Sequence, residues 1–147
     1  MVEEKIILQV LAEQKEYVGN YHPEQWVKRN EESLFEFDSP LAQVVIGVRR
    51  SGKSTLCHKV LLERGVNYGY ANFDDDRFAK LQTEDLNTVL SCVYQVYGTD
   101  IQYIFLDEIQ NVDGWHVFVN RLLRSNLHVV VTGSNAKLLS GELATHL

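Results

Sequence analysis

Apolar residues follow two patterns that alternate along the chain. Short continuous runs rich in β-branched and aromatic residues are typical of strands buried on both faces, whereas apolar residues three or four positions apart are typical of helices. The first pattern predicts strands at residues 44–46, 68–73, 101–106 and 127–132. The second predicts helices at residues 3–17, 53–62, 83–97, 115–124 and 136–143. Alternating buried strands and helices predict an α/β fold with a parallel sheet covered on both faces by right-handed crossovers.

The first part of the chain, residues 1–40, is predicted to be a helical lead-in that precedes the alternating core at residues 41–147. Pro23 fits the start of a short second helix. Residues 31–37 fit either a short helix or an edge strand. Tyr21 and Trp26 are candidates for stacking on a nucleotide base, although anchoring of the lead-in to the core is the favoured interpretation.

A glycine-rich loop follows the first predicted strand. Gly47, Gly52, Lys53 and Ser54 occupy the fixed positions of the pattern G-x-x-x-x-G-K-[ST], and strand, loop and helix follow in the required order. The predicted phosphate-binding loop consists of Gly47, Val48, Arg49, Arg50, Ser51, Gly52, Lys53, Ser54 and Thr55. The alternative is an ordinary glycine turn before a helix. A second motif, at residues 107–108, makes this alternative less favoured.

Each residue type in this loop suits the binding of a polyphosphate. Glycines let the backbone wrap tightly, so that several N–H groups and the positive end of the next helix face the phosphates. Lys53 would add a full charge at the β- and γ-phosphates, and Ser54 would offer a hydroxyl to Mg²⁺, which prefers oxygen ligands.

The third predicted strand runs directly into Asp107 and Glu108, the arrangement of a Walker B motif. In open α/β sheets ligands lie at the carboxyl ends of the strands. Asp107 would therefore hold Mg²⁺ through a water, and Glu108 would polarise the water that attacks the γ-phosphate. The alternative is that two polar residues simply end a strand.

Polar residues also follow the second and fourth predicted strands. Asn135 is the candidate for contacting the γ-phosphate or the attacking water, with Ser134 and Thr132 behind it. A helix N-cap explains Ser134 and Asn135 equally well. The run of aspartates at residues 74–76 fits a solvated turn or a carboxylate cluster near the nucleotide, and the turn is favoured.

Length, charge and residue composition limit the class of protein and its expected location. The 147 residues suffice for one domain with a core, and a net charge of −6 argues against a free-standing nucleic-acid binder. Cys57 and Cys92 are expected to be reduced and buried, and the histidines show no metal-ligand spacing. Neither a signal-peptide start nor an apolar run of the ~20 residues that span a bilayer occurs, so a cytoplasmic location without membrane contact is expected.

Taken together, the loop at residues 47–55, Asp-Glu-Ile-Gln at 107–110, residues 111–122 and Thr-Gly-Ser-Asn at 132–135 resemble a group of bacterial and archaeal AAA-type ATPases. The resemblance covers residues 41–147. It implies a P-loop NTPase three-layer sandwich with the strands ordered 1-4-3-2, and ATP with Mg²⁺ as cofactors. It also implies Lys53 and Ser54 as phosphate and metal ligands, Asp107 and Glu108 as the Walker B pair, and Asn135 as the sensor.

The family's ATPase domain continues to a fifth strand beside the first strand and to an arginine that completes the site, and many members carry a nuclease-like C-terminal domain. Residues 144–147 lie in a helical pattern without a stop signal, so an N-terminal fragment is expected. The fifth strand would then be missing, and the open edge of the first strand would favour either pairing between copies, as in a homo-oligomer, or looseness at residues 47–53. A role in nucleic-acid binding is suggested by the family resemblance alone.

Two functions remain in competition. The first is an ATPase in which Mg²⁺-dependent hydrolysis drives a conformational change. The second is a nucleotide-binding switch with little turnover that acts on a partner or on an absent C-terminal domain. A GTPase is disfavoured because Glu-Ile-Gln follows Asp107, where GTPases have Asp-x-x-Gly.

Overall fold

In the computed structural model, which describes residues 2–20, 35–37, 39–47 and 52–133, four strands form one sheet. The strands are β1 (Gln43–Ile46), β2 (Tyr68–Asn72), β3 (Tyr103–Asp107) and β4 (His128–Gly133). Their order is β1-β4-β3-β2, and every neighbouring pair is parallel. The predicted α/β class and the strand order that the resemblance implied are therefore confirmed.

Helices connect the strands much as the apolar periodicity predicts. The α-helices are α1 (Glu4–Gly19), α2 (Lys53–Arg64), α3 (Leu86–Tyr97) and α4 (Trp115–Arg124). Short 3₁₀ turns occur at η3 (Asp76–Phe78), η4 (Thr83–Asp85) and η5 (Ile109–Asn111). Gly65 follows α2 with a left-handed φ of 75°, the conformation that favours glycine after a helix. The helices predicted after Pro23 and at residues 136–143 lie outside the described residues.

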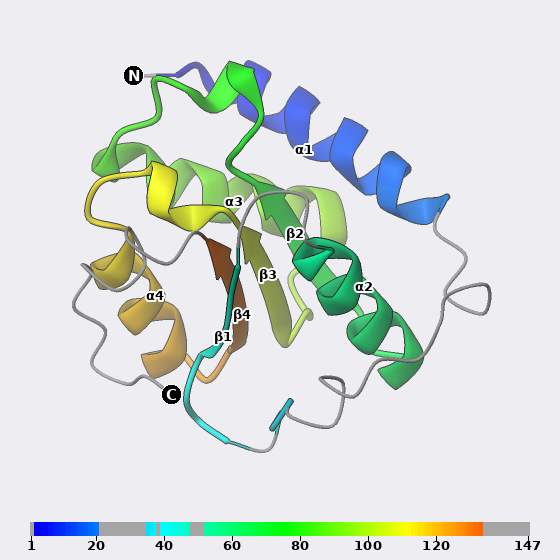
Figure 1. The fold of residues 1–147 in the computed structure, drawn as a ribbon. Coiled ribbons are helices and arrows are strands. Elements are labelled where there is room, and N and C mark those ends of the chain that lie inside the picture. Colours follow the sequence, from blue (N-terminus) through cyan, green and yellow to red (C-terminus); the bar gives the residue numbers. More distant parts are fainter. Residues whose placement is uncertain (1, 21–34, 38, 48–51, 134–147) are drawn as a thin grey trace.

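The two faces of the sheet pack against different helices, because successive side chains of a strand point to opposite faces. Tyr70 and Phe105 belong to a core cluster with α2, whereas Ala71, Ile104 and Leu106 belong to a second cluster with the other three helices. Figure 1 shows α2 on one side of the sheet and α1, α3 and α4 on the other. The described residues therefore form three layers: one helix, the sheet, and three helices.

The edge of β2 is covered by the N-terminal helix. Ile7, Val10 and Leu11 of α1 are fully buried in the same cluster as α3. The side chain of Gln14 makes two hydrogen bonds with the backbone of Asn72 in β2: its amide donates to the carbonyl (3.1 Å) and its oxygen accepts from the N–H (3.0 Å). A side-chain amide thus replaces a neighbouring strand at this point, which stabilises an edge that would otherwise expose polar backbone groups.

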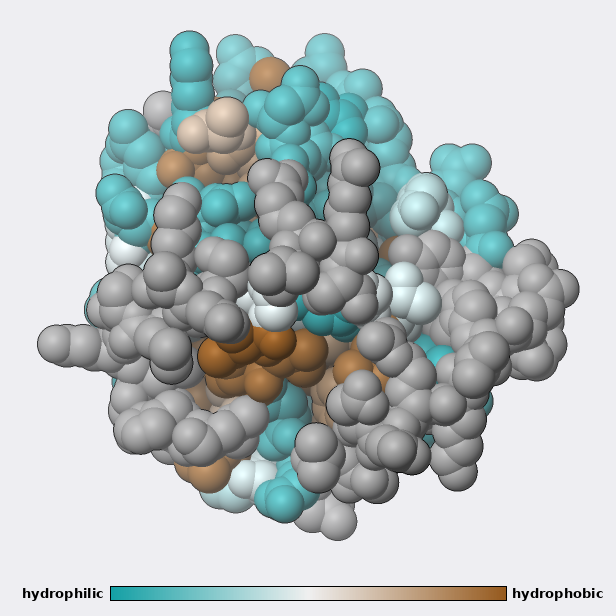
Figure 2. All heavy atoms as spheres, in the orientation of Figure 1, coloured by the Kyte–Doolittle hydropathy of each residue, from teal (hydrophilic) through white to brown (hydrophobic). Residues whose placement is uncertain are grey.

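β1 forms the opposite edge, with β4 as its one neighbour among the described strands. Ile46 of β1 is 39% exposed, and Figure 2 shows apolar surface over β1 at the centre of this view. The first residue of the strand, Gln43, binds the preceding segment, since its side-chain oxygen accepts from the N–H of Glu36 (2.9 Å) and its amide donates to the carbonyl of Glu36 (3.1 Å).

Candidate functional site

The start of α2 and the carboxyl ends of β2 and β3 converge on one polar cavity. Gly52 precedes α2 with a left-handed φ of 86°, a conformation that glycine adopts without steric cost, and its carbonyl accepts the first helical hydrogen bond from the N–H of Leu56 (2.9 Å). On the strand before the loop, the N–H of Gly47 donates to the carbonyl of Gly133 (3.3 Å). Gly52 therefore lies where the backbone turns into the N-terminus of α2, with the orphan N–H groups of that helix at the cavity, whereas Gly47 directly follows β1.

Lys53 pairs with Glu108 across this cavity. The Nζ atom of Lys53 lies 2.9 Å from Oε2 of Glu108, and the two side chains are only 7% and 13% exposed. A contact this sheltered between two opposite charges is short enough to be a charge-assisted hydrogen bond. It shows that the ammonium group of the loop and the second carboxylate of the strand end can reach the same point.

Asp107 accepts hydrogen bonds from three hydroxyl groups that come from three different elements. Ser54 at the start of α2 donates to Oδ2 (2.6 Å), as does Tyr70 of β2 (2.7 Å). Thr132 of β4 donates to the other oxygen, Oδ1. Because Asp107 is 4% exposed, these donors replace the water that an ionised carboxylate would otherwise bind.

Glu108 follows β3 with a left-handed φ of 56°, which is uncommon for a residue other than glycine. Its backbone N–H donates to Oγ1 of Thr132 (3.0 Å), and its Oε1 accepts from the side-chain amide of Gln110 (2.8 Å). The unusual backbone conformation and these two contacts turn the carboxylate toward Lys53. Backbone conformations of this kind cluster at functional sites.

The cavity between these groups has a volume of about 550 Å³. It is lined by Tyr17, Gly52, Lys53, Ser54, Thr55, Tyr70, Asn72, Asp74, Asp107 and Glu108. Its wall combines the start of α2, the two carboxylates that follow the apolar run of β3, and the end of β2.

The structure brings together six of the residues that the sequence predicted for the site, namely Gly52, Lys53, Ser54, Thr55, Asp107 and Glu108. Asn135, Ser134 and the loop residues Val48, Arg49, Arg50 and Ser51 lie outside the described residues, as do Tyr21 and Trp26.

The aspartate run at residues 74–76 divides between the two interpretations that the sequence left open. Asp74 lines the cavity, whereas Asp75 caps η3 and binds the guanidinium of Arg77 (2.9 Å). Arg77 also binds Glu13 of α1 (2.9 Å). The hydrogen bond from the Arg77 side chain holds the pKa of the Asp75 carboxyl below its ordinary value. The turn interpretation is confirmed for Asp75, and Asp74 adds a carboxylate to the cavity wall.

Three lining residues were not predicted from the sequence: Tyr17, Tyr70 and Asn72. Asn72 ends β2, so the rule that ligands meet the carboxyl ends of parallel strands would have found it. Tyr70 has the pattern of a core aromatic, and Tyr17 belongs to a helix whose position on the sheet edge follows from tertiary packing. Neither of these two carries a local sequence signal.

The oxygen atoms in this cavity suit a Mg²⁺ ion that also binds phosphate and water, rather than a metal ion whose ligands all come from the protein. No cluster of three or more His, Cys, Asp or Glu side chains able to hold a metal occurs among the residues that the structure describes. The Ser54 hydroxyl and the Asp107 carboxylate converge to 2.6 Å, which supplies two hard oxygens. Mg²⁺ is commonly bound by one or two protein ligands together with phosphate oxygens and water.

Two buried side chains of α2 near the cavity, His58 and Cys57, carry no charge. Burial lowers the pKa of His58 to about 3, so this imidazole is neutral at neutral pH. Burial also raises the pKa of the Cys57 thiol well above its ordinary value, and the negative charge of Asp107 adds to that effect. Cys57 and Cys92 are both free and buried, as predicted. His58 and Cys57 therefore add no charge to the acidic and basic groups of the cavity.

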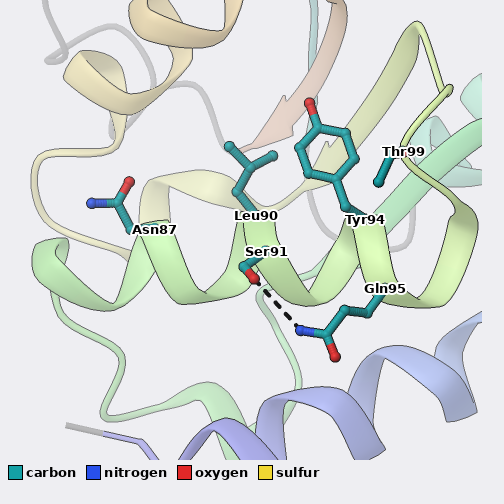
Figure 3. A pocket seen from close by; sticks show the side chains of 6 residues that line it. All are labelled: Asn87, Leu90, Ser91, Tyr94, Gln95 and Thr99. Carbon is teal, nitrogen blue, oxygen red and sulfur yellow. Dashed lines mark hydrogen bonds between the residues drawn. The ribbon is translucent and has the colours of Figure 1, made fainter.

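A second hollow of about 430 Å³ lies on the outer surface of α3. It is lined by Asn87, Leu90, Ser91, Tyr94, Gln95 and Thr99. Figure 3 shows these side chains along α3 and the turn after it, with a contact between Gln95 and Ser91. None of the six is a charged residue, so this hollow offers neither a cation for phosphate nor a catalytic carboxylate, and the cavity at α2 is the candidate functional site.

Comparison with known proteins decides the family. A family model described as "AAA domain" matches residues 39–147, most of the chain and all of the described site except Tyr17. The chain belongs to this AAA domain family. An AAA-type P-loop ATPase domain, which the motifs resemble, is therefore shown, and with it an ATPase-like, nucleotide-binding function in general terms.

Two proteins similar to this AAA domain have no described function. An uncharacterized protein of Methanocaldococcus jannaschii is 38% identical over 106 residues, and one of Haemophilus influenzae is 39% identical over 126 residues. The matches cover 71% and 79% of this chain, but only 24% and 31% of those proteins. The chain thus spans about a quarter of the length of the first relative and just under a third of the second.

Among solved structures, a DNA replication initiation factor has a similar fold. The TM-score is 0.55 at 16% identity, and the match covers 86% of this chain and 45% of that one. At this identity the likeness supports the AAA fold alone. No helix in the described part of the chain has the length and apolar character needed to cross a membrane.

Proposed function

We propose that this AAA domain binds ATP in a Mg²⁺-dependent manner in the cavity at the start of α2 and hydrolyses it. The observation that carries the proposal is the pair of contacts in that cavity. Lys53 binds Glu108 at 2.9 Å, and Ser54 binds Asp107 at 2.6 Å. A cation and a hydroxyl from the loop thus face the two carboxylates that follow β3, which is the arrangement that a metal–triphosphate needs.

Both contacts are of the kind that a bound nucleotide would replace. The ammonium of Lys53 would exchange the Glu108 carboxylate for oxygens of the β- and γ-phosphates, together with the backbone N–H groups at the start of α2. The hydroxyl of Ser54 would turn from Asp107 to the metal, and Asp107 would hold that metal through a water. Mg²⁺, when bound, supplies positive charge that offsets the negative charge of the phosphates and of the two carboxylates.

Glu108 is the proposed group that orients the attacking water. Once Lys53 binds phosphate, the carboxylate retains the amide of Gln110 on Oε1, while Oε2, which binds Lys53 in the free protein, becomes available to accept from water. Its backbone is fixed by Thr132 of β4, so the carboxylate keeps its place at the strand end. Asn135 is proposed as the sensor that follows β4, from the sequence pattern alone.

The alternative is a nucleotide-binding switch with little turnover. One observation favours it: the carboxylate needed for hydrolysis is held by both Lys53 and Gln110 in the free protein. A site in which Glu108 stays engaged would bind nucleotide and change shape without hydrolysing it. On this reading a homo-oligomer or a C-terminal domain of a longer protein would respond to the bound nucleotide.

Equilibrium titration with ATP and GTP, each with and without Mg²⁺, tests the proposal. We expect saturable binding of ATP that Mg²⁺ strengthens, because the metal adds ligands from Ser54 and Asp107 that nucleotide alone does not engage. We expect GTP to bind more weakly. Absence of binding by either nucleotide, or affinity that Mg²⁺ does not change, would contradict the proposed function. Release of inorganic phosphate from ATP, measured on the same samples, separates the hydrolase from the switch.

A further inference from the structure

The hydroxyl of Tyr70 is the least expected group near the metal-binding carboxylate. Tyr70 lies in the middle of β2, and its ring belongs to the apolar cluster under α2, where a phenylalanine would fill the same volume. Its hydroxyl nevertheless donates a hydrogen bond of 2.7 Å to Oδ2 of Asp107. We propose that Tyr70 is a positioning residue that holds Asp107 in the orientation required for the metal, an inference that rests on the proposed function.

The sheet register explains how the hydroxyl reaches the carboxylate. In the register of β2 and β3, Tyr70 lies opposite Phe105, and Asn72 lies opposite Asp107. Tyr70 is therefore the diagonal neighbour of Asp107, two residues before the position directly opposite it. Residues two apart on a strand share a face, and diagonal neighbours on adjacent strands are within reach of a long aromatic side chain. A tyrosine two residues before the end of β2 therefore spans the diagonal, with its ring in the core and its hydroxyl at the strand end.

The ring of Tyr70 is fixed by its neighbours. It is 5% exposed, and its centroid lies 4.4 Å from that of His58 and 5.1 Å from that of Phe105. A buried ring packed on two sides has little freedom to rotate away, so its hydroxyl is a pre-positioned donor for the carboxylate.

Metal binding makes this donor more important. In the free protein Oδ2 of Asp107 accepts from both Ser54 and Tyr70. If Ser54 turns to the metal, Tyr70 remains as the donor to Oδ2 and Thr132 as the donor to Oδ1. Together they would fix both oxygens while leaving the carboxylate its charge. Partners of this kind orient the ligand, and their loss typically costs about 10- to 100-fold in metal affinity.

Tyr70→Phe tests this role, with Tyr68→Phe as the matched control. Each change removes one phenol oxygen from a buried ring on the same face of β2, but the hydroxyl of Tyr68 contacts His58 and not Asp107. The probe is Mn²⁺ titrated into the full chain saturated with ADP, followed by electron paramagnetic resonance. ADP affinity without metal and the thermal unfolding midpoint are measured for both variants. We expect Tyr70→Phe to weaken Mn²⁺ binding about tenfold and to leave metal-free ADP binding unchanged, whereas Tyr68→Phe keeps wild-type Mn²⁺ affinity.

A rescue variant keeps the test independent of folding. 4-Aminophenylalanine at position 70 restores a hydrogen-bond donor at the same place, and we expect it to recover most of the lost Mn²⁺ affinity. Wild-type Mn²⁺ affinity in Tyr70→Phe, or equal losses in the two phenylalanine variants, would overturn the inference and leave the proposed function standing. If the metal does not change the affinity of the wild-type chain for ADP, the proposed metal site is wrong. The proposed function and this inference are then both overturned.

Discussion

Replacing Lys53 by alanine is expected to weaken the binding of ATP with Mg²⁺ by about 100-fold, which corresponds to about 3 kcal/mol and lies within the range for breaking a sheltered charge pair. The physical reason is that Lys53 is the one described cation whose side chain lines the cavity, and it is only 7% exposed. Without it, the phosphates would lose the one positive side chain that the described residues place in the cavity wall. Equilibrium titration by calorimetry measures the effect.

Lys59→Ala is the control for this variant. Lys59 is also on α2 and is 4% exposed, but its Nζ binds Glu63 one turn along the helix (3.1 Å) and its side chain does not line the cavity. We expect it to keep wild-type affinity. Because Lys53→Ala also removes the cation that binds Glu108, the unfolding free energy of both variants is measured alongside. Equal ATP affinity in Lys53→Ala and wild type would show that the nucleotide binds elsewhere.

Glu108→Gln is expected to lower the rate of ATP hydrolysis at least about 100-fold, since a positioned acid–base group typically contributes 10²- to 10⁴-fold. The amide keeps the size and the hydrogen-bonding reach of the side chain but cannot accept a proton from water. Binding of ATP is expected to be retained or strengthened, because Lys53 would no longer be held by an opposite charge in the free protein. Phosphate release and nucleotide titration on the same samples measure both quantities.

Glu63→Gln is the matched control here, because Glu63 is a half-exposed carboxylate that pairs with Lys59 and lies outside the cavity. It should hydrolyse ATP at the wild-type rate. If the wild-type chain binds ATP but shows no turnover for Glu108→Gln to reduce, the switch is the better description. Hydrolysis at the wild-type rate by Glu108→Gln would remove Glu108 from the proposed role.

The central part of the site was predictable because its signals are local. Glycine spacing, a lysine and a hydroxyl directly before a helix define one half of the cavity, and two carboxylates directly after an apolar strand define the other half. The physics of parallel sheets then requires both halves to lie at the same edge. The strand order needed the family resemblance, since periodicity identifies strands without saying which ones are neighbours.

The parts that were missed depend on packing between distant segments. Gln14 and Tyr17 of α1 meet the end of β2 only because Ile7, Val10 and Leu11 anchor that helix against α3. The sequence could not distinguish a tyrosine that donates to Asp107 from one that only fills the core.

The contacts of Thr132 give it a different role from the one that the sequence suggested. The sequence placed it behind Asn135 as a candidate for the γ-phosphate, whereas its hydroxyl binds Asp107 and accepts from the backbone of Glu108. That hydroxyl therefore links β4 to both Walker B residues. A single threonine at a strand end gives no sign of which neighbouring strand it will contact, because that depends on the order and register of the sheet.

The most direct measurement is a crystal structure of the chain with Mg²⁺ and a non-hydrolysable ATP analogue. The account predicts that Nζ of Lys53 leaves Glu108 for phosphate oxygens, that Oγ of Ser54 leaves Asp107 for the metal, and that Tyr70 still donates to Asp107. A nucleotide bound elsewhere on the molecule, with the Lys53–Glu108 and Ser54–Asp107 contacts both intact, would contradict it.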